Sequence, residues 1–302
     1  MNVIKVVPRG YCKGVVRAIS IAQQCRAQYP EQPVTVLGML VHNEYVKKAL
    51  ALRGIATVED PLRTREALLD EVESGVVIFT AHGISDQARA KAKQKKLICV
   101  DASCPDVLRT QELVRTRLQQ GNEVFYIGKA RHPEAEAVCA LSAHVHLITS
   151  EADIPSLPAD TPLFVTNQTT MSIFDVHKLF ARIKERFPGA QISEEICNAT
   201  RIRQQAVADL RDKHVDVLYV VGDTHSNNSK RLAQIGSQQG IPRVLLIESV
   251  QDIEPAQLKG AQNVAVTSGA STPTYLTAQV IDYLEHMEEG VPKPHISLQD
   301  IL

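Results

Sequence analysis

The chain has 302 residues and a formal net charge of −1 at pH 7. Apolar residues make up 44% of it and charged residues 22%, which is typical of a globular protein with a large core. This balance excludes a strongly basic nucleic-acid or membrane-surface binder, and no apolar run reaches the roughly 18 residues of a membrane span.

The first segment, MNVIKVVPRGYC, predicts a strand followed by a turn. It lacks the apolar core and the cleavage site of a signal peptide, so we expect a cytoplasmic protein. In that reducing compartment, the six cysteines are expected to pack, to bind metal or to take part in redox chemistry rather than to form disulfides. Residues 15–29 place apolar side chains on one face and predict a helix.

Three cysteines each stand where a strand ends and a helix begins. They are Cys12 in VIKVVPRGYCKG, Cys104 in LICVDASCP and Cys197 in AQISEEICNAT, and they are spaced 92 and 93 residues apart. Pro105, directly after Cys104, suits the first position of a helix. Near-equal spacing over so long a distance indicates an internal repeat.

Two further elements keep the rhythm of the cysteines. In the first, a buried parallel strand ends in a glycine and a polar residue follows four positions later. These pairs are Gly38 with His42, Gly128 with His132, and Gly222 with Ser226. In the second, an apolar strand runs into a short polar loop, and these loops hold His82, Thr169 and Ser271.

Helical patterns lie between the strands, for example over 201–213 and 273–287. Alternating strands and helices predict an α/β fold. We expect three similar lobes with small, mostly parallel sheets, related by a pseudo-threefold axis. The predicted lobes are 14–102, 103–195 and 196–285, with strand 1–13 completing the third and 286–302 forming a C-terminal tail.

Ligands of open parallel sheets bind beyond the carboxyl ends of the strands, where all of these loops lie. Three lobes around one axis would bring the three thiols into one central cavity ringed by polar side chains. The expected ring comprises His42, His82, His132, Thr169, Ser226, Asn228 and Ser271. A helix start favours the thiolate form of cysteine, so Cys12, Cys104 and Cys197 are candidate metal ligands.

Three thiolates without a fourth indicate a particular kind of metal site. A structural zinc site needs four closed ligands, and an iron–sulfur cube normally takes four thiolates. Three would leave one iron open for a substrate oxygen. The alternative is three unrelated buried cysteines, because a free cysteine is commonly buried. Cys25 on a helix face, Cys99 in a strand and Cys139 in a helical stretch are expected only to pack.

The polar ring suits a diphosphate, because histidines, hydroxyls and an amide can hold it by many hydrogen bonds. SNNSKRL, residues 226–232, follows a strand and opens a helix, whose backbone amides add to anion binding. Glu134 in HPEAE is the one carboxylate beside a ring histidine and is a candidate proton donor. Its alternative role is to answer the helix dipole in a first turn.

Several common motifs are absent from the sequence. It has no glycine-rich dinucleotide fingerprint, no Walker loop and no HExxH. Electrons for a redox reaction would therefore come from a separate protein.

Together, these residues resemble the family of 4-hydroxy-3-methylbut-2-enyl diphosphate reductases, which catalyse the last step of the methylerythritol phosphate route to isoprenoids. The resemblance runs from PRGYCKGVVRAI to GAST. It rests on eight motifs in order, VHN (41–43), AHG (81–83), DASCP (101–105), HPE (132–134), QTT (168–170), CNAT (197–200), SNNS (226–229) and GAS (269–271). It implies a three-lobed α/β fold around a central iron–sulfur cluster.

The resemblance also implies the cofactor. Cys12, Cys104 and Cys197 would hold a [4Fe–4S] cluster whose open iron binds the substrate hydroxyl. Two electrons would arrive one at a time from a ferredoxin or a flavodoxin, and the products would be isopentenyl diphosphate and dimethylallyl diphosphate. We expect a monomer or a weak dimer, with no nucleic-acid or membrane partner.

Catalytic roles are implied for Glu134, His132 and Thr169, with Glu134 supplying, through Thr169, the proton that lets the hydroxyl leave as water. The implied substrate-binding residues are His42, His82, His132, Thr169, Ser226, Asn227, Asn228 and Ser271.

Two positions depart from the family pattern. Arg131 precedes HPE where many members have glycine, and Asn227 stands in SNNS where some members have serine. Asn227 can still donate a hydrogen bond, so diphosphate binding is expected. Three alternatives to the reductase stay open. They are an iron–sulfur dehydratase like quinolinate synthase, a non-enzymatic iron–sulfur sensor or scaffold, and a zinc or metal-free small-ligand binder.

Overall fold

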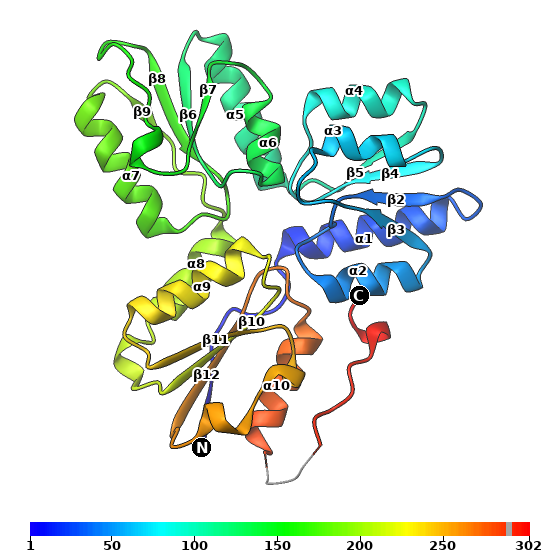
Figure 1. The fold of residues 1–302 in the computed structure, drawn as a ribbon, viewed down its shortest axis with the longest axis vertical. Helices are drawn as coiled ribbons and strands as arrows, with labels where there is room; N and C mark the ends of the chain where they lie inside the picture. The colour runs from blue at the N-terminus through cyan, green and yellow to red at the C-terminus, as the bar shows by residue number, and fades with distance from the viewer. Residues whose placement is uncertain (288–291) are drawn as a thin grey trace. The chain divides into compact units, whose positions relative to one another are not determined.

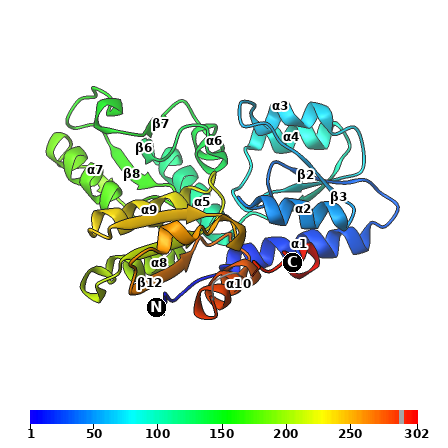
Figure 2. The same cartoon turned by 60° about the horizontal axis from the view of Figure 1, so that its bottom comes forward.

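The computed structural model describes residues 1–287 and 292–302. Its strands pair into three sheets of four strands each, and every pairing is parallel. Figures 1 and 2 show the three sheets from two directions. The first sheet is blue and cyan, the second sheet is green, and the third sheet is yellow and orange with the blue N-terminal strand. The predicted α/β fold with three small parallel sheets is confirmed.

The first sheet has the strand order β3-β2-β4-β5. Its strands are β2 (Val34–Leu37), β3 (Ile55–Val58), β4 (Val76–Phe79) and β5 (Ile98–Asp101). The helices in this part of the chain are α1 (Lys13–Gln28), α2 (Glu44–Leu52), α3 (Arg65–Leu68) and α4 (Asp86–Gln94). β2 and β4 are buried throughout, as expected of apolar runs in a parallel sheet. An apolar cluster that includes Leu68, Phe79 and Ala88 packs α3 and α4 onto this sheet.

The second sheet has the order β7-β6-β8-β9 and is covered on both faces. Its strands are β6 (Glu123–Ile127), β7 (Val145–Ile148), β8 (Leu163–Asn167) and β9 (Gln191–Ile192). Its helices are α5 (Pro105–Gln119), α6 (Pro133–Cys139) and α7 (Ile173–Arg186). Because side chains alternate along a strand, Phe125 packs in the cluster under α7, whereas Tyr126 packs in the cluster under α5 and α6.

The third sheet has the order β1-β12-β10-β11. Its strands are β1 (Asn2–Lys5), β10 (Val217–Val221), β11 (Arg243–Ile247) and β12 (Asn263–Ser268). Its helices are α8 (Asn198–Ala208), α9 (Asn227–Gln238) and α10 (Thr274–Glu285). The N-terminal strand pairs with β12, with Asn2 opposite Asn263, so the first strand of the chain completes a sheet built from its last third. Leu218 of β10 and Leu232 of α9 belong to its core.

The helices predicted over 15–29 and 273–287 are α1 and α10, with ends that differ by one or two residues, whereas a third differs more. The helix expected over 201–213 is α8, which begins at Asn198 and ends at Ala208. After it, a 3₁₀ turn at Arg211–Lys213 and a left-handed His214, at φ 47°, redirect the chain into β10. Leu210, near the end of the expected helix, is thus buried in the turn that follows α8.

The chain divides into two compact units. The first comprises Met1–Val16, His42–Leu52 and Asn198–Leu302, and the second comprises Arg17–Val41 and Arg53–Cys197. The predicted lobe boundaries follow the three sheets rather than these units, and they stay a prediction. Of the predicted C-terminal tail, 286–302, residues 288–291 lie outside the described part of the chain.

Candidate active site

The three repeated cysteines each stand directly before a helix. Cys12 precedes α1, Cys104 is the N-cap residue of α5, and Cys197 precedes α8. Pro105 is the first residue of α5, as predicted. All six cysteines are described, and none forms a disulfide. Each of the three thiols is thus a single thiol at a helix start.

The same backbone hydrogen bond holds each of these cysteines. The amide N–H of the cysteine donates to the carbonyl oxygen of the residue two positions beyond a central strand. These pairs are Cys12 with Ala270 (3.0 Å), Cys104 with Ala81 (2.9 Å) and Cys197 with Thr169 (3.0 Å). The acceptors lie in the three loops that the sequence pattern marked as repeats, so the repeat extends to the hydrogen bonds.

A second hydrogen bond fixes each loop two residues before the cysteine. There, the amide N–H donates to the last residue of the same central strand. The pairs are Gly10 with Ser268 Oγ (2.6 Å), Ala102 with the Phe79 carbonyl (3.0 Å) and Glu195 with Asn167 Oδ1 (3.1 Å). Each cysteine loop is therefore attached both to the end of the neighbouring strand and to the loop that follows that strand.

An arginine from each cysteine-led helix bonds to the loop of another repeated cysteine. These bonds join Arg17 Nη1 to the Ser103 carbonyl (2.8 Å), Arg109 Nε to Glu195 Oε2 (3.4 Å) and Arg203 Nη2 to the Gly10 carbonyl (2.8 Å). Of the three, Arg203 is buried, at 3% exposure. The arginines extend the repeat to side chains.

Glu134, in the first turn of α6, is a fully buried carboxyl group, at 1% exposure. Its Oε2 accepts from Thr169 Oγ1 (2.9 Å), and its Oε1 accepts from the Thr169 amide (2.8 Å) and from the Tyr126 hydroxyl (3.2 Å). Burial raises the pKa of Glu134 from 4.5 to about 7, although the bonds from Thr169 and Tyr126 favour the charged form. A carboxyl with such a pKa can give and take a proton near neutral pH.

His132 is the N-cap residue of α6. Its Nδ1 accepts from the Glu134 amide at 3.2 Å, so in the neutral ring the proton resides on Nε2. The His82 ring lies edge-on to it, with the ring centroids 5.5 Å apart. His82 Nδ1 also lies 3.5 Å from Thr80 Oγ1. Two neighbouring imidazoles thus lie in this part of the site, and one of them is hydrogen-bonded to the backbone of Glu134.

The first turn of α9 carries the residues of the SNNS motif. Ser226 is the N-cap residue, and its Oγ accepts from the Ser229 amide at 3.3 Å. Asn227 and Asn228 are buried in the first turn. Neither the nitrogen nor the oxygen of the Asn228 amide has a hydrogen-bond partner in residues 1–287 and 292–302. A buried amide at a helix N-terminus is suited to receive an anion.

His42 and Ser271 are joined within the first unit. The Ser271 hydroxyl donates to the His42 carbonyl oxygen at 2.9 Å. Both side chains follow the carboxyl end of a strand, β2 for His42 and β12 for Ser271. The expected phosphate ligand Ser271 thus also fixes the backbone at a second expected ligand.

The structure distributes the predicted residues over both units. The second unit contains Cys104, Cys197, His82, His132, Glu134 and Thr169. The first contains Cys12, His42, Ser226, Asn227, Asn228 and Ser271. Within the second unit, Thr169 contacts both Glu134 and Cys197. The carboxyl group and one predicted metal ligand thereby share a neighbour.

Two residues at these loops escaped the sequence analysis. Tyr126 looks like an ordinary core residue in the buried run EVFYI, although a tyrosine so near the end of a strand can carry its hydroxyl to the loops. The Ser229 side chain is fully buried beside Gly222 and Gly269, where a Cβ atom would collide with its Oγ. In the sequence, the sign of this close packing was the pair of glycines that follow two neighbouring strands.

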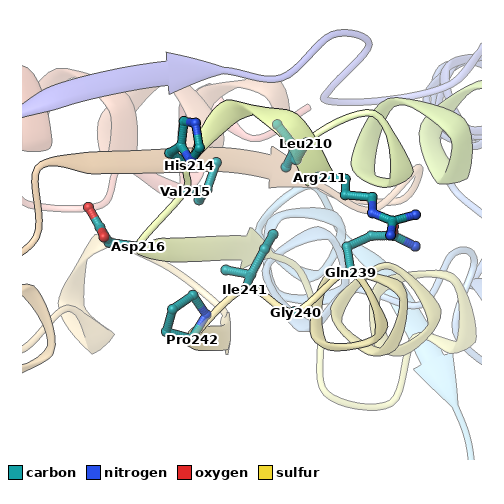
Figure 3. A pocket seen from close by; sticks show the side chains of 9 residues that line it. All are labelled: Leu210, Arg211, His214, Val215, Asp216, Gln239, Gly240, Ile241 and Pro242. Atoms are coloured by element: carbon teal, nitrogen blue, oxygen red, sulfur yellow. The ribbon is translucent and has the colours of Figure 1, made fainter.

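A surface cavity lies at the opposite end of the third sheet. It has a volume of about 310 Å³ and lies where β10 and β11 begin (Figure 3). Its lining is Leu210, Arg211, His214, Val215, Asp216, Gln239, Gly240, Ile241 and Pro242. Because the expected ligands follow the carboxyl ends of the strands, this cavity is not part of the candidate site.

The chain is similar to known proteins over almost its whole length. The model of the LytB protein family matches residues 3–285. The chain belongs to the LytB protein family. This LytB protein is 44% identical over 297 residues to a 4-hydroxy-3-methylbut-2-enyl diphosphate reductase of Anoxybacillus flavithermus, covering 97% of this chain and 93% of the relative. The reductase of Brevibacillus brevis is 46% identical over 296 residues, covering 97% and 94%.

A solved structure agrees with the LytB assignment. The E-1-hydroxy-2-methyl-but-2-enyl-4-diphosphate reductase from Plasmodium falciparum matches with a TM-score of 0.88 and 30% identity, over 99% of this chain and 95% of that one. As a LytB protein, the chain is an iron–sulfur oxidoreductase of isoprenoid biosynthesis. The predicted resemblance is confirmed, and the dehydratase, sensor and zinc-binder alternatives are set aside. No helix in residues 1–287 and 292–302 is both long and apolar enough to cross a bilayer.

Proposed function

We propose that this enzyme reduces 4-hydroxy-3-methylbut-2-enyl diphosphate to isopentenyl diphosphate and dimethylallyl diphosphate. In the balanced reaction, two electrons and two protons enter, the C–O bond to the hydroxyl breaks, a C–H bond forms and water leaves. The relatives are named for this substrate. The observation that carries the proposal is Glu134, a buried carboxyl group with a pKa of about 7 that is hydrogen-bonded to Thr169.

Cys12, Cys104 and Cys197 are the proposed ligands of a [4Fe–4S] cluster. The support is chemical and geometric. Each is a thiol at a helix start, outside any disulfide, and each has the same backbone hydrogen bond and a second bond from the residue two positions before it to the last residue of the neighbouring strand. Three thiolates fit a cube in which one iron lacks a protein ligand. When bound, the cluster supplies the electrons and a Lewis-acidic iron for the substrate hydroxyl.

The diphosphate is assigned to the polar loops. Ser226, Asn227 and Asn228 stand at the start of α9, where backbone amides and the buried Asn228 amide can donate to phosphate oxygens. His42, His82, His132 and Ser271 supply further donors, and for His132 the donor is Nε2, because Nδ1 already accepts from a backbone amide. Binding energy from this remote group can orient the reacting carbon.

Glu134 and Thr169 are the proposed path of the proton. The Glu134 carboxyl group gives its proton to Thr169 Oγ1, 2.9 Å away, as the Thr169 hydroxyl passes its own proton toward the leaving oxygen. The carboxylate that results is stabilised by the donors that surround it. His132 holds the start of α6 and so fixes the place of Glu134.

The remaining features of the proposal concern partners. A ferredoxin or a flavodoxin is the proposed electron donor, since the sequence has no motif for a nucleotide reductant. The cytoplasm is the proposed compartment, which six cysteines outside any disulfide support. A monomer or a weak dimer stays a prediction.

The test uses protein purified without oxygen. Electron paramagnetic resonance of the reduced protein is recorded with the substrate and with dimethylallyl diphosphate, which lacks the hydroxyl, and turnover is assayed with a one-electron reductant. We expect a cluster signal that changes most with the substrate, and two isomeric products. A cluster signal indifferent to the substrate, or no turnover, would overturn the proposal.

A further inference from the structure

The two oxygens of the Glu134 carboxyl group have unequal surroundings. Oε1 accepts two hydrogen bonds, from the Thr169 amide at 2.8 Å and from the Tyr126 hydroxyl at 3.2 Å. Oε2 lies 2.9 Å from a single hydroxyl oxygen, Thr169 Oγ1. The backbone amide can only donate, so Oε1 is an acceptor in either protonation state.

Tyr126 is held firmly where it makes this bond. Its side chain is fully buried in the apolar cluster under α5 and α6, among residues such as Val114 and Phe164. Gly128 lets the ring in, because a Cβ atom there would lie 3.0 Å from Tyr126 Cε1. Packing thus fixes the Tyr126 ring, and the ring in turn fixes the position of its hydroxyl oxygen.

We propose that Tyr126 is a positioning residue that directs the transferable proton of Glu134 to Oε2. The inference rests on the proposed role of Glu134 as proton donor and adds which oxygen acts. With two donors on Oε1, a third hydrogen has no open lone pair there, so the acidic proton resides on Oε2. With a carboxylate, the Thr169 hydroxyl donates to Oε2 across 2.9 Å. With the neutral acid the same contact reverses, so that Oε2–H donates to Thr169 Oγ1, which takes the proton as its hydroxyl passes its own proton on.

Tyr126 does not itself supply the proton. Burial and the neighbouring Glu134 raise the pKa of Tyr126 well above 10, so its hydroxyl stays a donor at any working pH. The other titratable groups that face this pair are Asp106 of α5, which favours neutral Glu134, Cys139 of α6, and His132 at the start of α6. None of them donates to Oε1 in the described residues.

The experiment compares Tyr126→Phe with the wild type, both loaded with the cluster. The infrared band of the protonated carboxyl is identified by its loss in Glu134→Gln. In Tyr126→Phe we expect that band at higher wavenumber, because its carbonyl oxygen has lost a donor. The alkaline limb of the pH–rate profile should rise by about one pH unit. We expect kcat to fall about tenfold with KM and iron content unchanged.

Tyr219→Phe is the matched control. Tyr219 is also fully buried in a central strand, β10, but its hydroxyl donates to Gln257 Oε1 at 2.9 Å. This variant should leave the infrared band and the pH–rate profile as in the wild type. A Tyr126→Phe enzyme with an unshifted band and profile would overturn the inference, as would equal shifts in both variants. Normal turnover by Glu134→Gln would instead overturn the proposed acid.

Discussion

At Glu134, burial and hydrogen bonding act against each other. Removal from water favours the neutral acid, whereas the bonds from Thr169 and Tyr126 favour the carboxylate. Burial is the larger effect, so the pKa rises to about 7. The same side chain therefore links the proposed proton transfer to the stability of the fold.

Stability should reflect this linkage. In the unfolded chain, Glu134 ionises near its ordinary pKa of 4.5, whereas in the folded chain it does so near 7. Its folded pKa is raised, so its contribution is complete below about 4.5 and declines as the pH rises to about 7, by about 3 kcal/mol in all. Urea unfolding at several pH values should show Glu134→Gln gaining on the wild type over that range. A constant difference would contradict the prediction.

Arg131 occupies a backbone conformation that suits glycine. Its φ is 61°, in the left-handed region, directly before the N-cap residue of α6. Arg131→Gly should raise the free energy of unfolding by about 1 kcal/mol, because relief of the left-handed strain exceeds the entropy that glycine adds to the unfolded chain. Arg131→Ala, which removes the side chain but keeps the strain, should show no such gain in urea unfolding.

At the scale of elements, the start of α9 depends on close packing against two strand ends. The Ser229 side chain fits only because Gly222 and Gly269 lack a Cβ atom. Gly222→Ala should destabilise the protein by about 1–3 kcal/mol. In a double-mutant cycle, Ser229→Gly should recover most of that loss, because the colliding side chain is gone. Additive losses in urea unfolding would show that the collision is relieved in another way.

The cysteine-led helices also depend on their arginines. Arg203→Met removes the bond to the Gly10 carbonyl, two residues before Cys12, and should speed the loss of iron to a chelator about tenfold. Arg211→Met, an exposed arginine just beyond α8, should not change that rate. Leu232→Ala controls for general destabilisation, since it opens the core of the same unit. If it speeds iron loss as much as Arg203→Met, the bond to Gly10 has no specific role.

The elements were largely predictable because the chain repeats them. Equal spacing of cysteines, strand-ending glycines and polar loops marks the parallel strands and the loops after them. The bond between Tyr126 and Glu134 was not predictable, because a tyrosine in an apolar run looks like core and its hydroxyl partner depends on how α6 leaves the strand. The left-handed backbone of Arg131 had a signal in the sequence, because many family members have glycine at that position, but an arginine by itself does not predict a positive φ.

For the whole molecule, the cysteines divide into two sets of three. The proposed ligands Cys12, Cys104 and Cys197 open helices, whereas Cys25, Cys99 and Cys139 lie within α1, within β5 and at the end of α6. Serine at any proposed ligand should lower bound iron to near background, because each loop is built alike. Serine at any of the other three should leave iron content at the wild-type level. Unequal losses among the first set would mean that the thiols are not equivalent ligands.

The division of the chain into units was beyond the reach of the sequence pattern. The repeat marks sheets, and it places α2 with the first sheet by order along the chain. The structure instead groups His42–Leu52 with the first and last segments of the chain. Contacts such as the bond from the Glu44 amide to Asp223, at 3.0 Å, join residues far apart in sequence and carry no periodic signal.

The three cysteines are held by backbone carbonyl groups, and this matters for protein engineering. Ala81, Thr169 and Ala270 each accept the cysteine amide through the backbone carbonyl, so this hydrogen bond places no demand on their side chains. Only Thr169 uses that freedom, as the neighbour of Glu134. A repeated scaffold can thus vary its chemistry in one repeat while keeping the thiols in place, and Ala81 and Ala270 are positions where a designer could install a second hydroxyl.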